Sequence, residues 1–357
     1  MHFLRSGVPF LAGIAALACV PAKQLEPEAT NCGCEDMPMK ISKDSPLDGA
    51  EQSDLKGAIA PVHDPSMAKE GRTYYAFCTG PGIPVRSSAD RITWSEPHRS
   101  FEAPFPWTAT TIPGSRDHYW APDISYFNHK WHLYYAVSTF GRNRSAIGLA
   151  TNATLDPTRK EYKWVDEGPI FQSYPKDDYN AIDPNVAFDE HGKPWLSFGS
   201  FWSGLKILPL DPATGKPLNE NAPKGIASRP HTPEQPGAIE APFIIRKGRR
   251  YYLFASFDFC CRGVRSTYNI RVGRSEKIDG PYMDRDGKDM MEGGGTHVLD
   301  GKQRWKGPGG QSVIKDGRNY VLVYHSYDAQ ANGVPTLRIE TMTWDKDGWP
   351  HVPSDTE

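Results

Sequence analysis

One structural unit recurs five times in this chain of 357 residues. Each copy opens with a short motif, usually containing Pro, and continues with a few apolar residues. A turn with Gly or Asn and a basic residue follows, and an aromatic-rich segment ends the copy. The copies start near residues 64, 120, 183, 240 and 309. A unit that returns this regularly indicates an architecture built from repeated supersecondary elements.

Each unit predicts a β-hairpin, because an apolar strand, a turn and an aromatic strand follow in order. In four units a third strand is also expected, at Ala146–Thr151, Leu205–Leu210, Ile270–Ser275 and Leu337–Thr343. Sheets of about four strands repeated around an axis form a β-propeller. We therefore predict an all-β, five-bladed β-propeller over residues 56–357. A two-sheet sandwich is the alternative fold, but it does not explain why the motif returns five times.

The composition agrees with an all-β protein that has many turns. The chain has 10 Trp, 16 Tyr and 15 Phe, which favour strands, and 33 Gly and 32 Pro, which favour turns. The formal net charge is −2. Because nucleic-acid binding depends on a surplus of Lys and Arg, no nucleic-acid partner is expected.

Residues 1–22 have the features of a secretion signal. An N-terminal segment with one His and one Arg precedes the apolar run Val8–Val20, which is too short to span a bilayer. Val20-Pro21-Ala22 then offers a small-residue cleavage site. Residues 23–55 are polar and predict a linker that leads into the propeller.

A lipoprotein signal is the alternative for the same segment. Ala16–Cys19 resembles a bacterial lipidation box, in which Cys19 would carry the lipid and provide the only membrane attachment. Either interpretation predicts a secreted or extracytoplasmic protein. The alternatives include a periplasmic protein and, if Cys19 is lipidated, a lipid-anchored one. We also expect it to be a monomer.

Acidic residues recur at one place in the repeat. Alignment on the apolar strand puts Asp64, Trp120, Asp183, Glu240 and Gly309 or Gly310 just before that strand. In a propeller, equivalent positions on the innermost strands form a ring around the axis. Three neighbouring carboxylates would repel one another and raise pKa values, although single acids are usually only solvated. Glycoside hydrolysis needs such a set: an acid, a base and a group that tunes the acid.

The motifs around these acids resemble those of glycoside hydrolase family 43, and most of all the endo-1,5-α-L-arabinanases. They are His63-Asp64-Pro65-Ser66, Trp120-Ala121-Pro122-Asp123, Asn180-Ala181-Ile182-Asp183-Pro184, Phe198-Gly199-Ser200-Phe201-Trp202, Ile239-Glu240-Ala241-Pro242-Phe243 and Tyr324-His325-Ser326-Tyr327-Asp328. The resemblance implies a five-bladed propeller that cleaves internal α-1,5 links of arabinan with inversion. It assigns Asp64 as general base, Asp183 as pKa modulator and Glu240 as general acid.

Two alternatives to endo-arabinanase stay open. An exo-acting α-L-arabinofuranosidase or β-xylosidase would share the fold and the acids, and would differ in having a blind pocket instead of an open groove. A propeller that only binds carbohydrate belongs to another class. A binding module has no use for a matched acid and base, which argues against it.

His325 is the candidate metal ligand. The resemblance implies a cation near the channel centre, commonly calcium, held through one His and water. Calcium ordinarily prefers oxygen ligands, and a strand-end His hydrogen-bonded in the core is the alternative. Gly309-Gly310 stands where related enzymes often have Gly-His-Asn. No organic cofactor is expected.

Other residues near the acids are candidates for substrate contact. Trp120, Phe201 and Trp202 could each stack on a sugar face or belong to the core. Asn180 and Ser200 could hydrogen-bond sugar hydroxyls or cap turns. The adjacent Cys260 and Cys261 could form a vicinal disulfide that touches the substrate, or carry two free thiols.

Overall fold

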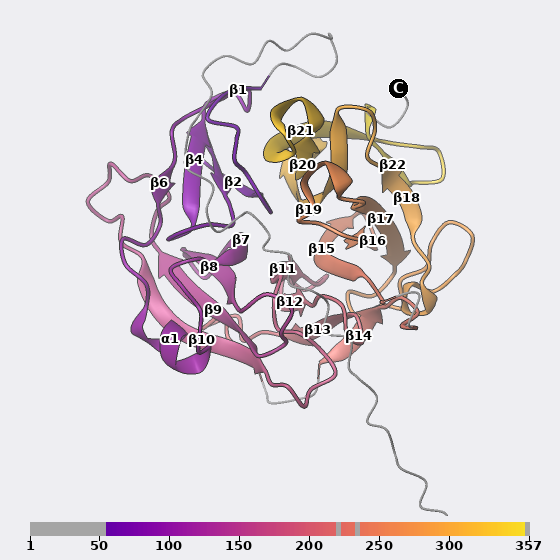
Figure 1. Ribbon diagram of the computed structural model, residues 1–357, viewed down its shortest axis with the longest axis horizontal. Helices are drawn as coiled ribbons and strands as arrows, with labels where there is room; N and C mark the ends of the chain where they lie inside the picture. Colours follow the sequence, from indigo (N-terminus) through magenta and orange to yellow (C-terminus); the bar gives the residue numbers. More distant parts are fainter. Residues whose placement is uncertain (1–54, 219–222, 233–235, 354–357) are drawn as a thin grey trace, which may run out of the picture.

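The computed structural model describes residues 55–218, 223–232 and 236–353. Five antiparallel sheets of four strands each are arranged radially around a centre (Figure 1). The first blade consists of β2 (Ser66–Glu70), β3 (Thr73–Phe77), β4 (Pro84–Ser88) and β6 (His98–Arg99), and the second of β7 (Trp120–Phe127), β8 (Lys130–Val137), β9 (Ser145–Asn152) and β10 (Val165–Ser173). The third blade consists of β11 (Asn185–Phe188), β12 (Pro194–Phe198), β13 (Leu205–Pro209) and β14 (Lys224–Ala227), and the fourth of β15 (Ile239–Lys247), β16 (Arg250–Phe257), β17 (Asn269–Ser275) and β18 (Thr296–Leu299). The fifth blade consists of β19 (Trp305–Asp316), β20 (Asn319–Asp328), β21 (Val334–Trp344) and β22 (Pro350–His351). The predicted five-bladed propeller is confirmed.

A few short elements lie outside the blades. They are a parallel pair, β1 (Lys56–Gly57) with β5 (Thr93–Trp94), the helix α1 (Pro106–Thr111), and the 3-10 turns η1 (Gly263–Arg265), η2 (Met290–Glu292) and η3 (Ala329–Ala331). Within the described ranges, no helix is long and apolar enough to cross a membrane. The signal peptide, the lipidation site at Cys19 and nearly all of the 23–55 linker lie outside the described residues.

The innermost hairpins form where the sequence has turn residues. Gly71, Gly192, Gly248 and Gly317 occupy the hairpins of four blades with φ between 60° and 75°. In the β7–β8 hairpin, Asn128 and His129 both have positive φ, 46° and 59°. Two consecutive left-handed residues match the right-handed twist of the flanking strands. The turn residues therefore set the register of each hairpin.

Aromatic and aliphatic side chains fill the space between neighbouring blades. Five buried clusters occur, one between each successive pair of blades, and the last joins the fifth blade to the first. The segment before β2 helps to close the ring, since Leu337 N donates to Ile59 O at 2.9 Å and Val62 N to Pro335 O at 2.8 Å. This packing fixes the innermost strands around the axis.

The innermost strands share a backbone bend that corrects the sequence alignment. Left-handed φ values of 40° to 56° occur at Asp64, Ala121, Asp183, Ala241 and Gly310. Glu240 and Trp120 each precede this bend by one residue, so they are not equivalent to Asp64 and Asp183 as predicted. At Glu240 the strand is still in register with β16, opposite Ser256, and the bulge follows it. Because successive side chains of a strand point in opposite directions, the one-residue offset points the Glu240 side chain in a different direction from those of Asp64 and Asp183.

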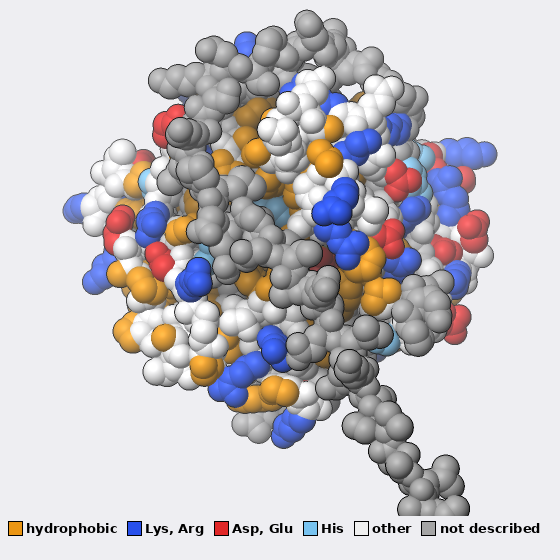
Figure 2. Space-filling model, in the orientation of Figure 1, with side chains coloured by type: hydrophobic (Ala, Val, Ile, Leu, Met, Phe, Trp, Pro, Cys, Tyr) orange, Lys and Arg blue, Asp and Glu red, His pale blue; other side chains and the backbone are white. Residues whose placement is uncertain are grey.

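The outer surface carries both signs of charge. On the face shown in Figure 2, Lys and Arg side chains are interspersed with Asp and Glu among hydrophobic and neutral ones. This mixture agrees with the small formal net charge of −2.

Candidate active site

The bends of all five blades meet at the axis and line a small cavity. Its volume is about 30 Å³, and it is lined by Asp64, Pro65, Ser66, Ala121, Pro122, Asp123, Asp183, Pro184, Ala241, Pro242, Phe243, Gly310, Gln311 and Ser312. This is enough for about two ordered water molecules. Asp64 and Asp183 reach this lining, and Glu240 stays outside it.

Asp64 is held as an anion by two neighbours, His63 and Thr79. Its Oδ2 accepts hydrogen bonds from His63 Nδ1 at 2.7 Å and from Thr79 Oγ1 at 2.7 Å. Its Oδ1 lies 3.7 Å from Nδ1 of His325. Burial alone would raise the pKa of Asp64, but the charge and hydrogen bond of His63, with the hydrogen bond from Thr79, lower it to about 2. Asp64 is therefore ionised at neutral pH.

Glu240 has the opposite electrostatic environment. It is 8% exposed, and its Oε2 lies 2.5 Å from the hydroxyl of Ser200. Burial and the charge of Asp64 raise the pKa of Glu240 to about 7, against the hydrogen bond from Ser200. The rise from 4.5 corresponds to about 3 kcal/mol in favour of the protonated form. A carboxyl group in this state can donate a proton near neutral pH.

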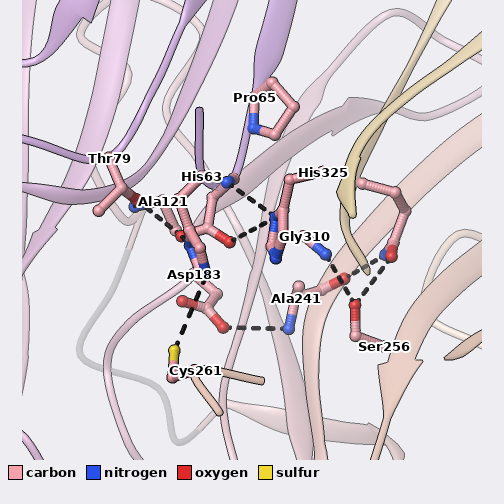
Figure 3. Close-up of polar contacts among 12 residues, drawn as sticks. His63, Pro65, Thr79, Ala121, Asp183, Ala241, Ser256, Cys261, Gly310 and His325 are labelled. Atoms are coloured by element: carbon pink, nitrogen blue, oxygen red, sulfur yellow. Dashed lines mark hydrogen bonds and ion pairs between the residues drawn. The ribbon is translucent and has the colours of Figure 1, made fainter. Parts of the chain in front are cut away.

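Asp183 interacts electrostatically with both of the other acids. Its Oδ2 accepts a hydrogen bond from the backbone N–H of Ala241 at 3.1 Å, as Figure 3 shows. Burial, and then the charges of Glu240 and Asp64, raise the pKa of Asp183 well above its usual range. Because like charges in one buried site oppose each other, Asp183 and Glu240 together retain a proton to higher pH than either would alone. The structure thus brings the three predicted acids together.

His325 is fully buried beside Asp64. Its Nδ1 accepts a hydrogen bond from the backbone N–H of Asp64 at 3.1 Å, and its Nε2 lies 3.3 Å from the hydroxyl of Tyr327. Burial, and then the charge of His63, lower the pKa of His325 well below its usual value, so the ring is neutral. A neutral ring has one lone pair, and here Asp64 N–H occupies it.

This arrangement does not suit His325 as a direct calcium ligand. Calcium takes six to eight oxygen ligands, and a cation at Nδ1 would displace the backbone bond from Asp64. Calcium at His325 stays a prediction, and no chemical step is assigned to a metal below. The same packing requires a glycine at position 310, because a Cβ there would lie 2.3 Å from Asp64 Oδ1 and 2.9 Å from the ring of His325.

Comparison with known proteins agrees with this geometry. The family model for glycosyl hydrolases family 43 matches residues 59–350, which include every blade. This chain belongs to glycosyl hydrolase family 43. It is therefore a glycoside hydrolase, as the motifs predicted.

Relatives of this family 43 hydrolase include both endo- and exo-acting enzymes. A protein from Bacillus subtilis (strain 168), named extracellular endo-α-(1→5)-L-arabinanase 1, is 46% identical over 293 residues, covering 81% of this chain and 87% of that protein. One from Cellvibrio japonicus (strain Ueda107), named extracellular exo-α-(1→5)-L-arabinofuranosidase, is 45% identical over 312 residues, covering 85% of this chain and 88% of that protein. The structure of Cellvibrio cellulosa α-L-arabinanase complexed with arabinohexaose has a TM-score of 0.79 and 42% identity, covering 83% of this chain and 96% of that chain.

The predicted substrate-contact residues of the hydrolase fall into two groups. Trp120, Phe201 and Trp202 are half-buried, so part of each ring faces solvent. Ser200 is buried and holds Glu240, which gives it a positioning role in the protein. Asn180 is 3% exposed and its Oδ1 accepts a hydrogen bond from Ser145 at 2.6 Å, so its amide oxygen already has a partner within the protein.

Cys260 and Cys261 carry reduced thiols and are not joined by a disulfide. Cys261 has a left-handed φ of 62°. The thiol of Cys260 hydrogen-bonds Glu240 and also the thiol of its neighbour. The bond to Cys261 acts in the opposite direction, yet burial raises the pKa of Cys260 to about 12. The pair therefore lies directly against the carboxyl group with the raised pKa.

Two further residues of the site were missed by sequence reasoning. Thr79 bridges two blades, donating to Asp64 and accepting from the backbone N–H of Ala121 at 2.8 Å. No motif marks it, because its role depends on a neighbouring blade. Tyr327 hydrogen-bonds His63 Nε2 at 2.8 Å and accepts from Cys261 N at 2.7 Å. Tyr327 stood within a quoted motif but was given no role.

Proposed function

We propose that this family 43 hydrolase cleaves internal α-1,5 links of arabinan with inversion at the anomeric carbon. The observation that carries the proposal is the contrast between Glu240, whose pKa is raised to about 7, and Asp64, whose pKa is lowered to about 2. A protonated acid and an ionised base at the same pH are what glycoside hydrolysis requires. The substrate is inferred from the arabinan-acting relatives named above.

In the proposed reaction each acid has one task. Glu240 transfers its proton to the glycosidic oxygen as the bond from that oxygen to the anomeric carbon breaks. Asp64 accepts a proton from a water molecule, which attacks the same carbon from the opposite face of the ring. The products are a sugar with inverted configuration and a free hydroxyl on the leaving chain. Ser200 can stay hydrogen-bonded to Glu240 throughout the reaction, because its hydroxyl can donate to ionised Glu240 or accept from the protonated form.

Asp183 is proposed to tune and orient Glu240. As an anion, Asp183 would disfavour ionisation of Glu240, and the fixed N–H of Ala241 stabilises that anion.

Product analysis tests the proposed endo action. Incubation with linear arabinan is expected to release a ladder of oligosaccharides from the start, with a rapid drop in viscosity. The same enzyme is expected to act weakly on nitrophenyl α-L-arabinofuranoside and not on the matching xyloside. Release of arabinose or one short product only, with slow loss of viscosity, would instead support the exo alternative, which the Cellvibrio japonicus relative favours.

The proposal includes export from the cytoplasm. It rests on the secretion-like features of residues 1–22 and on the relatives that are named extracellular. Expression of the full chain followed by fractionation tests it, with mass spectrometry of the mature N-terminus to distinguish cleavage after Ala22 from lipidation at Cys19.

The pH profile is expected to have its alkaline limb near pH 7. Because the active form of Glu240 is protonated, kcat/KM is high below its pKa and falls about tenfold per pH unit above it. The Asp64 limb lies near pH 2, because the base is active only when ionised. Initial rates on arabinan from pH 4 to 9 measure this. Ser200→Ala removes a hydrogen bond that lowers the Glu240 pKa, so its alkaline limb is expected at higher pH; an unchanged limb would count against Glu240 as the titrating acid.

A further inference from the structure

An open cleft lies at the outer edge of the propeller. Its volume is about 450 Å³, which is within the range of sites that hold small ligands. Residues 99–105, which begin in β6, form one wall, and residues 162–164, which lead into β10, form the other. β6 and β10 are the outermost strands of the first and second blades (Figure 1). The cleft shares no lining residue with the axis cavity, so the two are separate.

Aromatic rings line the cleft and are held in place by packing. Phe101 is 3% exposed, and its ring lies edge-on to that of Trp164 at a centroid distance of 6.2 Å. Trp164 also packs edge-on against Phe77, at 6.1 Å, and against Tyr162, at 6.5 Å. Trp164 and Tyr162 are half-buried, so part of each ring is accessible. The cleft is therefore preformed and offers aromatic surface to a ligand.

Charged side chains of both signs lie around the aromatic rings. Glu102 and Lys163 line the cleft and are exposed, and neither side chain forms an ion pair or hydrogen bond with another described residue. Arg99 also lines the cleft, but its Nη1 donates to Asp117 Oδ2 at 2.8 Å. The unpaired charges at the cleft are therefore one acid and one base, which balance. A ligand that carries a net charge would meet a like charge here, whatever its sign.

The remaining polar group favours a neutral ligand with hydroxyls. Trp164 Nε1 donates a hydrogen bond to the Tyr162 hydroxyl at 3.1 Å. Within the described ranges the Tyr162 O–H has no acceptor of its own, so it can donate to a ligand. A sugar has C–H groups that pack on aromatic rings and hydroxyls that bind polar tips such as this one. The lining therefore fits a neutral carbohydrate better than a nucleotide or a charged peptide.

We propose that this cleft is a second carbohydrate-binding site, which holds one stretch of an arabinan chain while another stretch lies at the acids. The identity of the sugar rests on the proposed function, whereas the site rests on the geometry of the cleft. A chain held at one site has a high effective concentration at the other, so the cleft raises affinity for the polymer and leaves the chemical step unchanged. A substrate with one sugar cannot reach both sites and gains nothing.

The indole N–H of Trp164 reports on the cleft independently of activity. The full-length protein is labelled with ¹⁵N in a Glu240→Gln background, so that added sugar is not cleaved. The Trp164 indole signal is assigned as the one that Trp164→Phe removes. Titration with α-1,5-linked arabinotriose is expected to shift this signal until it saturates, which gives a Kd for the cleft. A signal that stays in place up to the highest sugar concentration would overturn the site.

Ala103→Trp and Ala213→Trp form a matched pair of variants. Ala103 is exposed and lines the cleft, so a tryptophan there fills part of it without removing a buried side chain. Ala213 is exposed in the turn after β13 and lines neither the cleft nor the axis cavity. The Kd from the Trp164 signal is expected to rise at least about tenfold in Ala103→Trp, because the new ring clashes with the sugar, and to stay unchanged in Ala213→Trp. Equal Kd values for the two variants would contradict the site.

Kinetics of the same two variants, with Glu240 intact, measure the effect on the polymer. Ala103→Trp is expected to raise KM on linear arabinan at least about threefold relative to Ala213→Trp, with equal kcat and with equal rates on nitrophenyl α-L-arabinofuranoside. Equal KM values on arabinan would refute the tethering of the chain. A Trp164 shift in a protein that never cleaves arabinan would refute the proposed function and keep the site. Cleavage of arabinan without a Trp164 shift would do the reverse.

Discussion

Replacing Glu240 with glutamine is expected to lower kcat on arabinan by about 10²–10⁴-fold. Glutamine keeps the shape and the contact with Ser200 but has no proton to give to the leaving oxygen. The loss is expected to be much smaller on an aryl arabinofuranoside whose phenol is strongly acidic, because a phenolate leaves without protonation. Steady-state kinetics on both substrates measure the difference.

Glu292→Gln provides the matched control for this change. Glu292 is an exposed residue of η2, away from the axis, and its variant is expected to keep full activity. Thermal unfolding of both variants checks that the propeller is intact. Equal losses on the two substrates in Glu240→Gln would contradict the assignment of Glu240 as the acid.

Replacing Asp64 with asparagine is expected to abolish turnover on both substrates, by about 10²–10⁴-fold or more. Water must be activated whatever the leaving group, and the amide cannot accept its proton. The substitution also removes the negative charge that binds His63 and raises the pKa of Glu240. The residual alkaline limb on arabinan is therefore expected to move to lower pH, which a pH series of initial rates on arabinan detects.

Asp286→Asn is the control for Asp64→Asn. Asp286 is exposed in the loop before η2, and its variant is expected to match the parent in rate and stability. If Asp64→Asn retains near-parent kcat on the aryl substrate while it loses arabinan cleavage, then Asp64 contributes to substrate binding or leaving-group departure and is not the base.

The positions of the three acids could be predicted from the sequence only in part. The repeat and the motifs identified Asp64, Asp183 and Glu240 from local patterns, and the structure brings them together. The alignment nevertheless placed Glu240 one residue out of register. A bulge between Glu240 and Phe243 causes this offset, and bulges depend on how two strands pair, which a single strand's residues do not display.

The predictions for the metal ligand and the substrate contacts concern side chains whose partners the sequence does not display. His325 was chosen by resemblance, yet its nitrogens are engaged by Asp64 and Tyr327. Asn180 was chosen for its polar side chain, yet Ser145 already binds its oxygen. Each of these outcomes depends on partners that lie on other strands or blades.

The sequence by itself determined the blades and the identity of the acids. Turn residues, alternating apolar strands and short motifs are local patterns of a few residues, so they can be recognised in the sequence. Only the tertiary structure decided the chemistry of those acids. His63 and Tyr327 are 264 positions apart and hydrogen-bonded, and Thr79 reaches Asp64 from the next strand. Because burial and neighbouring charges set a pKa, the pKa values of Asp64 and Glu240 move apart only when the ring of blades closes.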